Sequence, residues 1–242
     1  MTEPTTDPLD LRSLESDAPT VLDADALFEG VAGQVAAEKG LAAWLRNRPT
    51  IERLGIALVS VVVTSLLVLL LTGRVDWPVY PLPRMSWVLG GLALLYLLMV
   101  WFALLPAYKP TPQQVVIVGL AALGLALPFV QGLLPIAHDL HAMSLQGAGD
   151  DLVSKAVACF VFGSILAIPP LVIVALLDRD RQASGFRRLF TALCGGMAGL
   201  LALQLHCPIT QPIHLIWGHA PVAAGMVLMV GLFHAVRGFR RR

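Results

Sequence analysis

Long apolar blocks alternate with short polar connections along the chain, a pattern that predicts membrane-spanning helices. Each block is about 17 to 25 residues long, the length that an α-helix needs to cross a hydrocarbon core about 30 Å thick. The last block is short, and its helix could begin as early as Pro212. The fold class is predicted to be all-α, a six-helix transmembrane bundle. The predicted spans are Leu54–Thr72, Ser86–Leu105, Val115–Leu134, Leu152–Leu177, Leu189–Leu205 and Val222–Val236.

The segment before the first span has a different character, so residues 1–50 and 51–242 are expected to form two regions. Residues 1–19 are too polar to form a core, and we expect them to be largely disordered. Apolar positions near helical spacing predict a helix from Asp23 to Leu45. Intermittent apolar side chains are candidates for binding a partner, the alternative being a solvated tail. These candidates are Leu9, Leu11, Leu14, Leu27, Val31 and Leu41.

Composition and charge placement agree with a membrane protein of defined orientation. Hydrophobic residues make up 57% of the chain and charged residues 14%, against roughly a quarter charged in soluble domains. The net charge of +1 gives no reason to expect direct nucleic-acid binding. If the acidic N-terminus lies in the cytoplasm, alternate connections carry most of the Lys and Arg, as cytoplasmic loops do. Both termini are therefore expected in the cytoplasm, and the outer connections keep only Arg74, Arg84 and Lys155.

Cysteine and histidine residues gather at the predicted outer face. His206, Cys207, His214 and His219 lie in the connection between the last two spans, and Cys159 lies about two turns into the fourth. Thiols and imidazoles are the usual ligands of zinc and copper, and a thiolate also reacts with oxidants. A transition-metal site or a disulfide between Cys159 and Cys207 is then possible. Interfacial histidines facing water, and a cysteine that only packs, are the competing interpretations.

Two further histidines lie on the same predicted side. His138 and His141 follow the third span and are possible additional ligands, although an ordinary connecting loop explains them as well. Cys194, deeper in the fifth span, is expected to be a packing residue. There is no glycine-rich phosphate loop, no hydrolytic constellation and no pair of carboxylates within a span. We therefore expect a protein that is not an enzyme.

Several of these segments resemble the second half of the NrsF-type membrane anti-sigma factors. The similar segments are Ala158-Cys159-Phe160, the Pro169-Pro170 bend, the basic loop through Arg188, Gly195 to Gly199, and Leu205-His206-Cys207-Pro208. The resemblance implies a bacterial inner-membrane protein that holds an extracytoplasmic-function sigma factor and releases it on an outside signal. It also implies that the paired cysteines, Cys159 and Cys207, take part in sensing.

The chain departs from that family after Pro208, where it carries His214 and Trp217-Gly218-His219 in place of the family's acidic residue and Trp-Tyr pair. The added histidines favour a metal or a metal-containing ligand as the stimulus. The sequence thus predicts a membrane-bound anti-sigma factor that responds to an envelope redox or metal signal. The alternative is an integral-membrane metal- or haem-binding protein of a transport or electron-transfer assembly.

Overall fold

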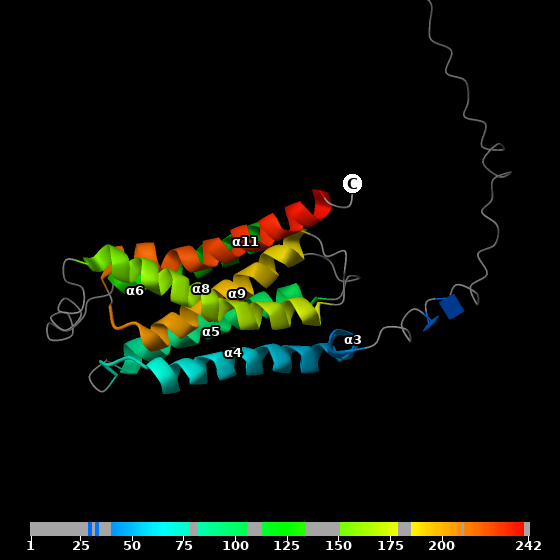
Figure 1. Ribbon diagram of the computed structural model, residues 1–242, viewed down its shortest axis with the longest axis horizontal. Helices are drawn as coiled ribbons and strands as arrows, with labels where there is room; N and C mark the ends of the chain where they lie inside the picture. Colours follow the sequence, from blue (N-terminus) through cyan, green and yellow to red (C-terminus); the bar gives the residue numbers. More distant parts are fainter. Residues whose placement is uncertain are drawn as a thin grey trace, which may run out of the picture. The chain divides into compact units, whose positions relative to one another are not determined.

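The computed structural model describes residues 29–30, 32–33, 40–77, 82–105, 113–133, 151–178, 185–209 and 211–239. The chain divides into two compact units, Met1–Ala43 and Trp44–Arg242. The ordered elements of the described part are all helical (Figure 1). They are α3 (Leu41–Arg46), α4 (Thr50–Thr72), α5 (Leu82–Ala103), α6 (Gln114–Leu133), α8 (Leu152–Leu177), α9 (Gly185–His206), α10 (Pro212–His214), the π-helix η2 (Leu215–His219) and α11 (Ala220–Phe239).

Five segments among the described residues are long and apolar enough to cross a membrane. They are Thr50–Thr72, Met85–Ala103, Leu152–Leu177, Gly185–His206 and Pro212–Val236. The described residues thus give five such segments, where the sequence predicted six spans. The predicted third span coincides with α6, which packs on α5 and α11 but contributes only the shorter apolar stretch Val115–Gly124 to this count. The all-α, multi-pass fold class is confirmed, and the last span does begin at Pro212.

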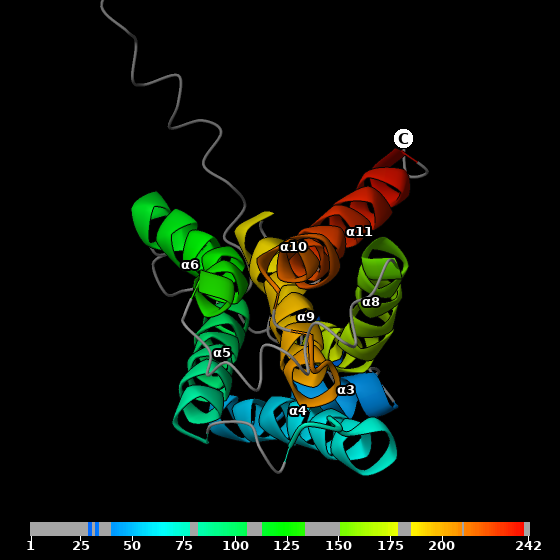
Figure 2. The same cartoon turned by 90° about the vertical axis from the view of Figure 1, so that its left-hand side faces the viewer.

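Helix α9 is the centre of the bundle. It packs against α8, α11, α5 and α4, and Figure 2 shows it enclosed by them. Every residue from Phe190 to Leu205 is buried. The surrounding helices keep one face covered by α9 and leave apolar side chains such as Leu70 and Leu232 on the outside. This is the arrangement expected where lipid is as apolar as the protein interior.

Small residues allow α9 to approach its neighbours closely. A Cβ added at Gly199 would lie 2.5 Å from the carbonyl oxygen of Gly163 in α8, and one at Gly196 would lie 2.6 Å from the Cα of Ala223 in α11. Backbones that meet this closely gain dispersion contacts, which drive helix association in membranes in the absence of a hydrophobic force. The glycines of α9 therefore fix the spacing of three helices.

Buried arginines hold the helix ends together. At the end where α4 begins, Arg53 Nη1 donates to the carbonyl oxygen of Leu177, the last residue of α8, at 3.1 Å. Arg187, near the start of α9, donates to the carbonyl oxygen of Leu105 and pairs with Asp178. The last carbonyls of a helix lack intrahelical partners and carry partial negative charge, so a guanidinium satisfies both needs.

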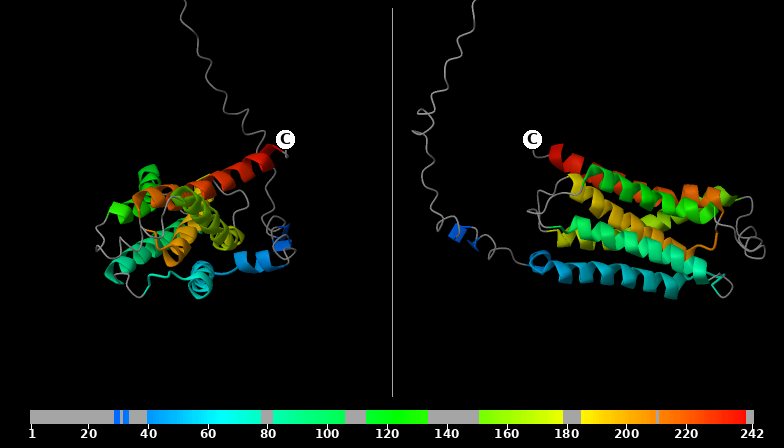
Figure 3. Two further views of the ribbon diagram at one scale, coloured as in Figure 1. Left: turned by 60° about the vertical axis from the view of Figure 1, so that its left-hand side comes forward. Right: turned by 180° about the vertical axis from the view of Figure 1, so that it is seen from behind.

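At the opposite end, where α9 finishes, the connection after α4 is fastened to α9. Arg74 makes a bidentate ion pair with Asp76, at 2.8 and 2.7 Å. Its backbone N–H donates to the carbonyl oxygen of Leu205, and its Nη1 donates to that of Gln204. Figure 3 shows α4 and α9 reaching this end of the bundle together. The ion pair is thus a support for the C-terminal end of α9.

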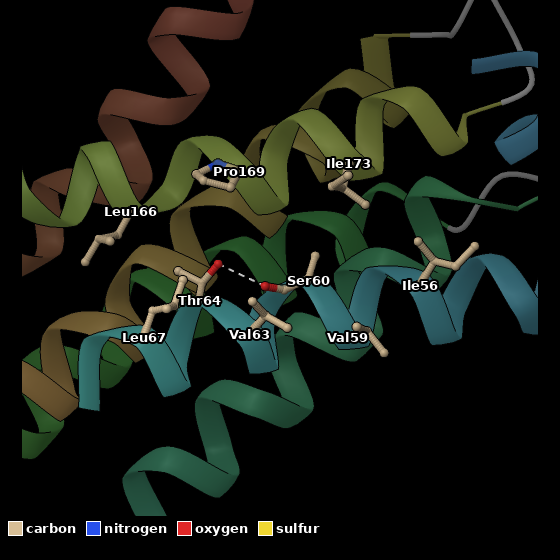
Figure 4. A pocket seen from close by; sticks show the side chains of 9 residues that line it. All are labelled: Ile56, Val59, Ser60, Val63, Thr64, Leu67, Leu166, Pro169 and Ile173. Carbon is tan, nitrogen blue, oxygen red and sulfur yellow. Dashed lines mark hydrogen bonds between the residues drawn. The ribbon is translucent and has the colours of Figure 1, made fainter. Parts of the chain in front are cut away.

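Helix α8 runs through Pro169 and Pro170 as one 26-residue helix. Between it and α4 lies a groove of about 420 Å³, lined almost wholly by apolar side chains (Figure 4). The two hydroxyl groups that line the groove form hydrogen bonds within α4: Ser60 donates to the carbonyl oxygen of Ala57, and Thr64 donates to that of Ser60. Both hydroxyl groups in the lining of this groove are thus already hydrogen-bonded to the backbone.

The predicted helix from Asp23 to Leu45 is wrong as a single unbroken element. Gly40 has a φ of +102°, which lies outside the right-handed helical region and interrupts the helix. Glycine can adopt this positive φ without steric cost because it has no Cβ. Helix α3 starts directly after it and ends at Arg46. The remaining predicted partner-binding residues, Leu9, Leu11, Leu14, Leu27 and Val31, lie outside the described residues.

Candidate metal centre

Four potential ligands meet at the end of the bundle where α9 finishes. They come from α8, from the residue after α9 and from the consecutive elements α10 and η2. Cys159 lies in α8, Cys207 directly follows α9, His214 ends α10, and His219 ends η2. One sulfur or nitrogen atom from each residue can be chosen so that all four atoms lie within 4.8 Å of one another. The sequence predicted these four as candidates, and the fold brings them together.

The contacts within the group are short and shielded from solvent. The two sulfurs lie 3.6 Å apart, and the Cys207 sulfur lies 3.3 Å from Nε2 of His214. The rings of His214 and His219 are edge to face, with centroids 5.3 Å apart. Their exposed fractions are 0% and 1%, and those of Cys207 and Cys159 are 4% and 9%. The centre is therefore buried, and all three cysteines of the chain are free thiols.

The position of Cys207 follows from the way α9 ends. Its backbone N–H donates to the carbonyl oxygen of Leu203 at 2.8 Å, which continues the helical bonding by one residue. The next two free carbonyls, of Gln204 and Leu205, are taken by Arg74. Pro208 follows immediately and cannot continue the helix. The thiol is thereby held at a fixed point beyond the last turn.

A π-helical turn places the two imidazoles on one side. In η2 the backbone N–H of Ala220 donates to the carbonyl oxygen of Leu215, five residues earlier. Hydrogen bonds that span five residues place residues five apart on the same side of the turn. An α-helix, with 3.6 residues per turn, would place them on different sides. His214 and His219 have this spacing of five. Single π-turns inside helices often mark functional sites.

Gly218 allows this turn to lie against α8. A Cβ added there would lie 3.0 Å from the carbonyl oxygen of Ala156 and 3.4 Å from the Cβ of Cys159. Any larger residue would clash with the backbone of α8, and no change of side-chain rotamer could relieve that clash. Gly218 thus brings the imidazole-bearing turn to the cysteine of α8.

Several polar atoms in the centre have no hydrogen-bond partner among the described residues. These are Nδ1 of His214 and both ring nitrogens of His219. A buried polar group without a partner costs about 1–3 kcal/mol, so such groups in a native protein need an explanation. A bound metal ion accepts one lone pair from each imidazole and would account for one ring nitrogen of His219, while His214 would ligate through Nε2, the nitrogen that lies beside Cys207.

The electrostatics of Cys207 reflect the same crowding. Its contact with the Cys159 thiol, and then burial, raise the pKa of the Cys207 thiol, and the two imidazoles lower it to a smaller extent. A metal ligand must be a thiolate, so binding of a metal at this centre would release a proton from Cys207.

His206 lies outside the group, contrary to the prediction. Its Nδ1 is 2.7 Å from the carbonyl oxygen of Thr72, and its ring packs on Phe162 at a centroid distance of 4.4 Å. The imidazole therefore links the end of α9 to the end of α4. The sequence could not separate this role from that of its neighbour Cys207, because adjacent residues at a helix end point in different directions.

The other candidates divide in the same way. Cys194 is fully buried in the apolar core of α9, as expected of a packing residue. His138 and His141 lie outside the described residues, and Leu41, in α3, is 67% exposed. Sequence reasoning missed the supporting roles of Arg74 and Gly218. Only Arg74 could have been noticed in the sequence, because it is one of the few basic residues in the predicted outer connections.

A comparison of the chain with protein-family models, curated proteins and solved structures finds no match. The class of protein therefore rests on the fold and the centre. The chain forms a multi-pass helical membrane protein with a buried group of two thiols and two imidazoles at one end of its bundle.

Proposed function

We propose that this protein is a membrane-bound anti-sigma factor, which sequesters an extracytoplasmic-function sigma factor and releases it on an envelope redox or metal signal. The observation that carries the proposal is the group formed by Cys159, Cys207, His214 and His219, whose ligand atoms lie within 4.8 Å of one another. Thiols and imidazoles in this arrangement respond to metal ions and to oxidants. The orientation that goes with the proposal has this centre outside and both termini in the cytoplasm of a bacterial inner membrane, so α6 would have to cross as the sixth span.

A signal at one end of the bundle must change the other end if it is to release a partner. Helix α9 supports such coupling, because Cys207 follows its last residue and Arg187 lies in its first turn. Arg187 contacts the ends of α5 and α8 through Leu105 and Asp178. A regulator of this kind requires two arrangements of the helices that bind the partner differently.

The N-terminal segment is the proposed partner-binding region. It has nine acidic residues up to Glu38 and a single basic residue, Arg12. An acidic segment with intermittent leucines complements a basic protein surface, and charge complementarity of this type speeds association and selects partners. The exposed side chain of Leu41 is available for such a contact.

The test is capture of the partner by the full-length protein. The tagged chain, solubilised from native membranes, is expected to retain a sigma factor that mass spectrometry identifies. A matched chain with Leu9, Leu11 and Leu14 changed to Ser should lose it while keeping the same helix content. Recovery of no sigma factor by the unaltered chain, with expression of the regulated genes unchanged on deletion, would refute the proposal.

The same centre favours one second candidate, an integral-membrane metal protein whose ligands are permanent and whose N-terminal segment is incidental. Four ligand atoms this close leave no space for a porphyrin between them, so the geometry favours an ion over haem. One bound ion per chain, with no transcriptional effect on deletion, would support this candidate over the regulator.

A further inference from the structure

We infer that the centre takes a divalent ion of the zinc class in a closed tetrahedral site with two cysteine and two histidine ligands, and that this ion clamps η2 to α8. The inference deepens the proposed function by naming the ligand of the site, and only its regulatory meaning rests on that function.

The interatomic distances match a tetrahedral ion. Zn–S bonds of about 2.3 Å and Zn–N bonds of about 2.0–2.1 Å place two sulfurs about 3.8 Å apart and a sulfur and a nitrogen about 3.5 Å apart. The sulfurs of Cys159 and Cys207 are 3.6 Å apart, and Cys207 lies 3.3 Å from Nε2 of His214. The fourth ligand atom, from His219, lies within 4.8 Å of the others. Small movements would therefore complete the coordination.

The charges favour a divalent ion in this buried position. Two thiolates carry a charge of −2 and two neutral imidazoles carry none, so an M²⁺ ion gives a centre with no net charge. A buried site without net charge avoids the desolvation penalty of an isolated ion. Mixed sulfur and nitrogen ligation excludes magnesium and calcium, which take oxygen, and a tetrahedral S₂N₂ set is typical of zinc.

The ligand set is closed, which determines what the ion can do. Four protein ligands fill a tetrahedral ion, and catalytic zinc sites keep one position for water. The ion would therefore act as a cross-link between α8, the residue after α9, and the α10–η2 segment that precedes α11. Gly218 already lets that turn lie close to α8, since a Cβ in its place would be 3.4 Å from the Cβ of Cys159, so the clamp would reinforce an existing close approach.

Cobalt(II) alone is the probe that tests the inference. Purified full-length protein in detergent, with its thiols reduced, is titrated with Co²⁺ and followed by visible absorption. Tetrahedral thiolate-bound cobalt gives intense d–d bands and a sulfur-to-metal charge-transfer band. We expect these bands to saturate at one Co²⁺ per chain and to vanish when Zn²⁺ is added. Absence of the bands in the unaltered protein would overturn the inference.

Matched variants separate the centre from the other thiols and imidazoles. Cys159→Ser and His219→Ala each remove one ligand and should weaken Co²⁺ binding more than about 100-fold. Removal of a residue that only hydrogen-bonds to a ligand already lowers metal affinity about 10- to 100-fold. Cys194→Ala and His206→Gln change the same residue types outside the group and should bind as the unaltered protein does. Equal binding by Cys159→Ser and Cys194→Ala would also overturn the inference.

The two proposals fail separately. The cobalt titration uses no sigma factor, so a normal cobalt spectrum with no captured partner would refute the regulator and leave the metal site. Capture of a sigma factor by a protein that binds no cobalt would do the reverse. If Cys159→Ser does not fold, the spectrum of the unaltered chain together with that of His219→Ala still decides the question.

Discussion

Replacing Gly199 by alanine tests whether close approach of α9 to its neighbours stabilises the bundle. The new Cβ would lie 2.5 Å from the carbonyl oxygen of Gly163, 2.9 Å from Cγ1 of Val222 and 3.2 Å from the Cβ of Ala167. The nearest atom belongs to the α8 backbone, so no change of rotamer relieves the clash. The helices must separate or the carbonyl must move.

The magnitude follows from two opposing terms. Overpacking a well-packed interior costs about 1–3 kcal/mol, and a clash with backbone belongs at the upper end. Alanine has a helix propensity about 1 kcal/mol better than glycine, which offsets part of this cost. We expect Gly199→Ala to lower the free energy of unfolding by about 2 kcal/mol.

The matched control is Gly55→Ala in α4, where a new Cβ has no neighbouring atom within 4 Å. This variant keeps the propensity gain without the clash, so it should be as stable as the original protein or up to about 1 kcal/mol more stable. Both variants are measured by SDS titration of the purified protein, with far-UV circular dichroism as the readout. If Gly199→Ala is as stable as Gly55→Ala, the close packing of α9 does not determine stability and the reasoning is wrong.

Three other predictions test the supports of the fold and the centre. Arg74→Met leaves the buried Asp76 carboxylate without its partner and should destabilise the protein by about 3–5 kcal/mol in the same titration; adding Asp76→Asn should recover part of the loss, and no recovery would contradict the ion-pair argument. Tyr96→Phe removes the 2.8 Å hydrogen bond to the α4 backbone and should cost only about 0.6 kcal/mol, so a loss above about 2 would show that the hydroxyl has another role. Gly218→Ala should push η2 away from α8 and weaken Co²⁺ binding about tenfold although all four ligands remain, whereas unchanged binding would show that the turn does not need this contact.

The structure also shows how hydropathy relates to position in the bundle. In α9, 89% of the most apolar window is buried, against 22% in α4, yet α9 is the least hydropathic of the five spans. A central helix contacts other helices on all sides and therefore needs glycine and alanine for close approach. A peripheral helix contacts lipid and can carry large aliphatic side chains on most of its surface.

Features that depend on local composition and length could be predicted from the residues alone. Apolar blocks long enough to cross a bilayer predicted the helices, because each such segment must satisfy its backbone internally. The last one was predicted from Val222 with an earlier start near Pro212 left open, and it begins at Pro212. The residue types of Cys159, Cys207, His214 and His219 predicted metal or thiol chemistry.

Which of those residues meet depends on long-range packing between the helices. The spacing of His214 and His219 is unfavourable in an α-helix, and the π-turn that brings them together depends on packing against α8 through Gly218. His206, next to Cys207 in sequence, bonds instead to Thr72, more than a hundred residues away. Hydropathy does not predict such contacts, because lipid and protein interior are equally apolar. Long-range packing alone therefore selects the candidate ligands.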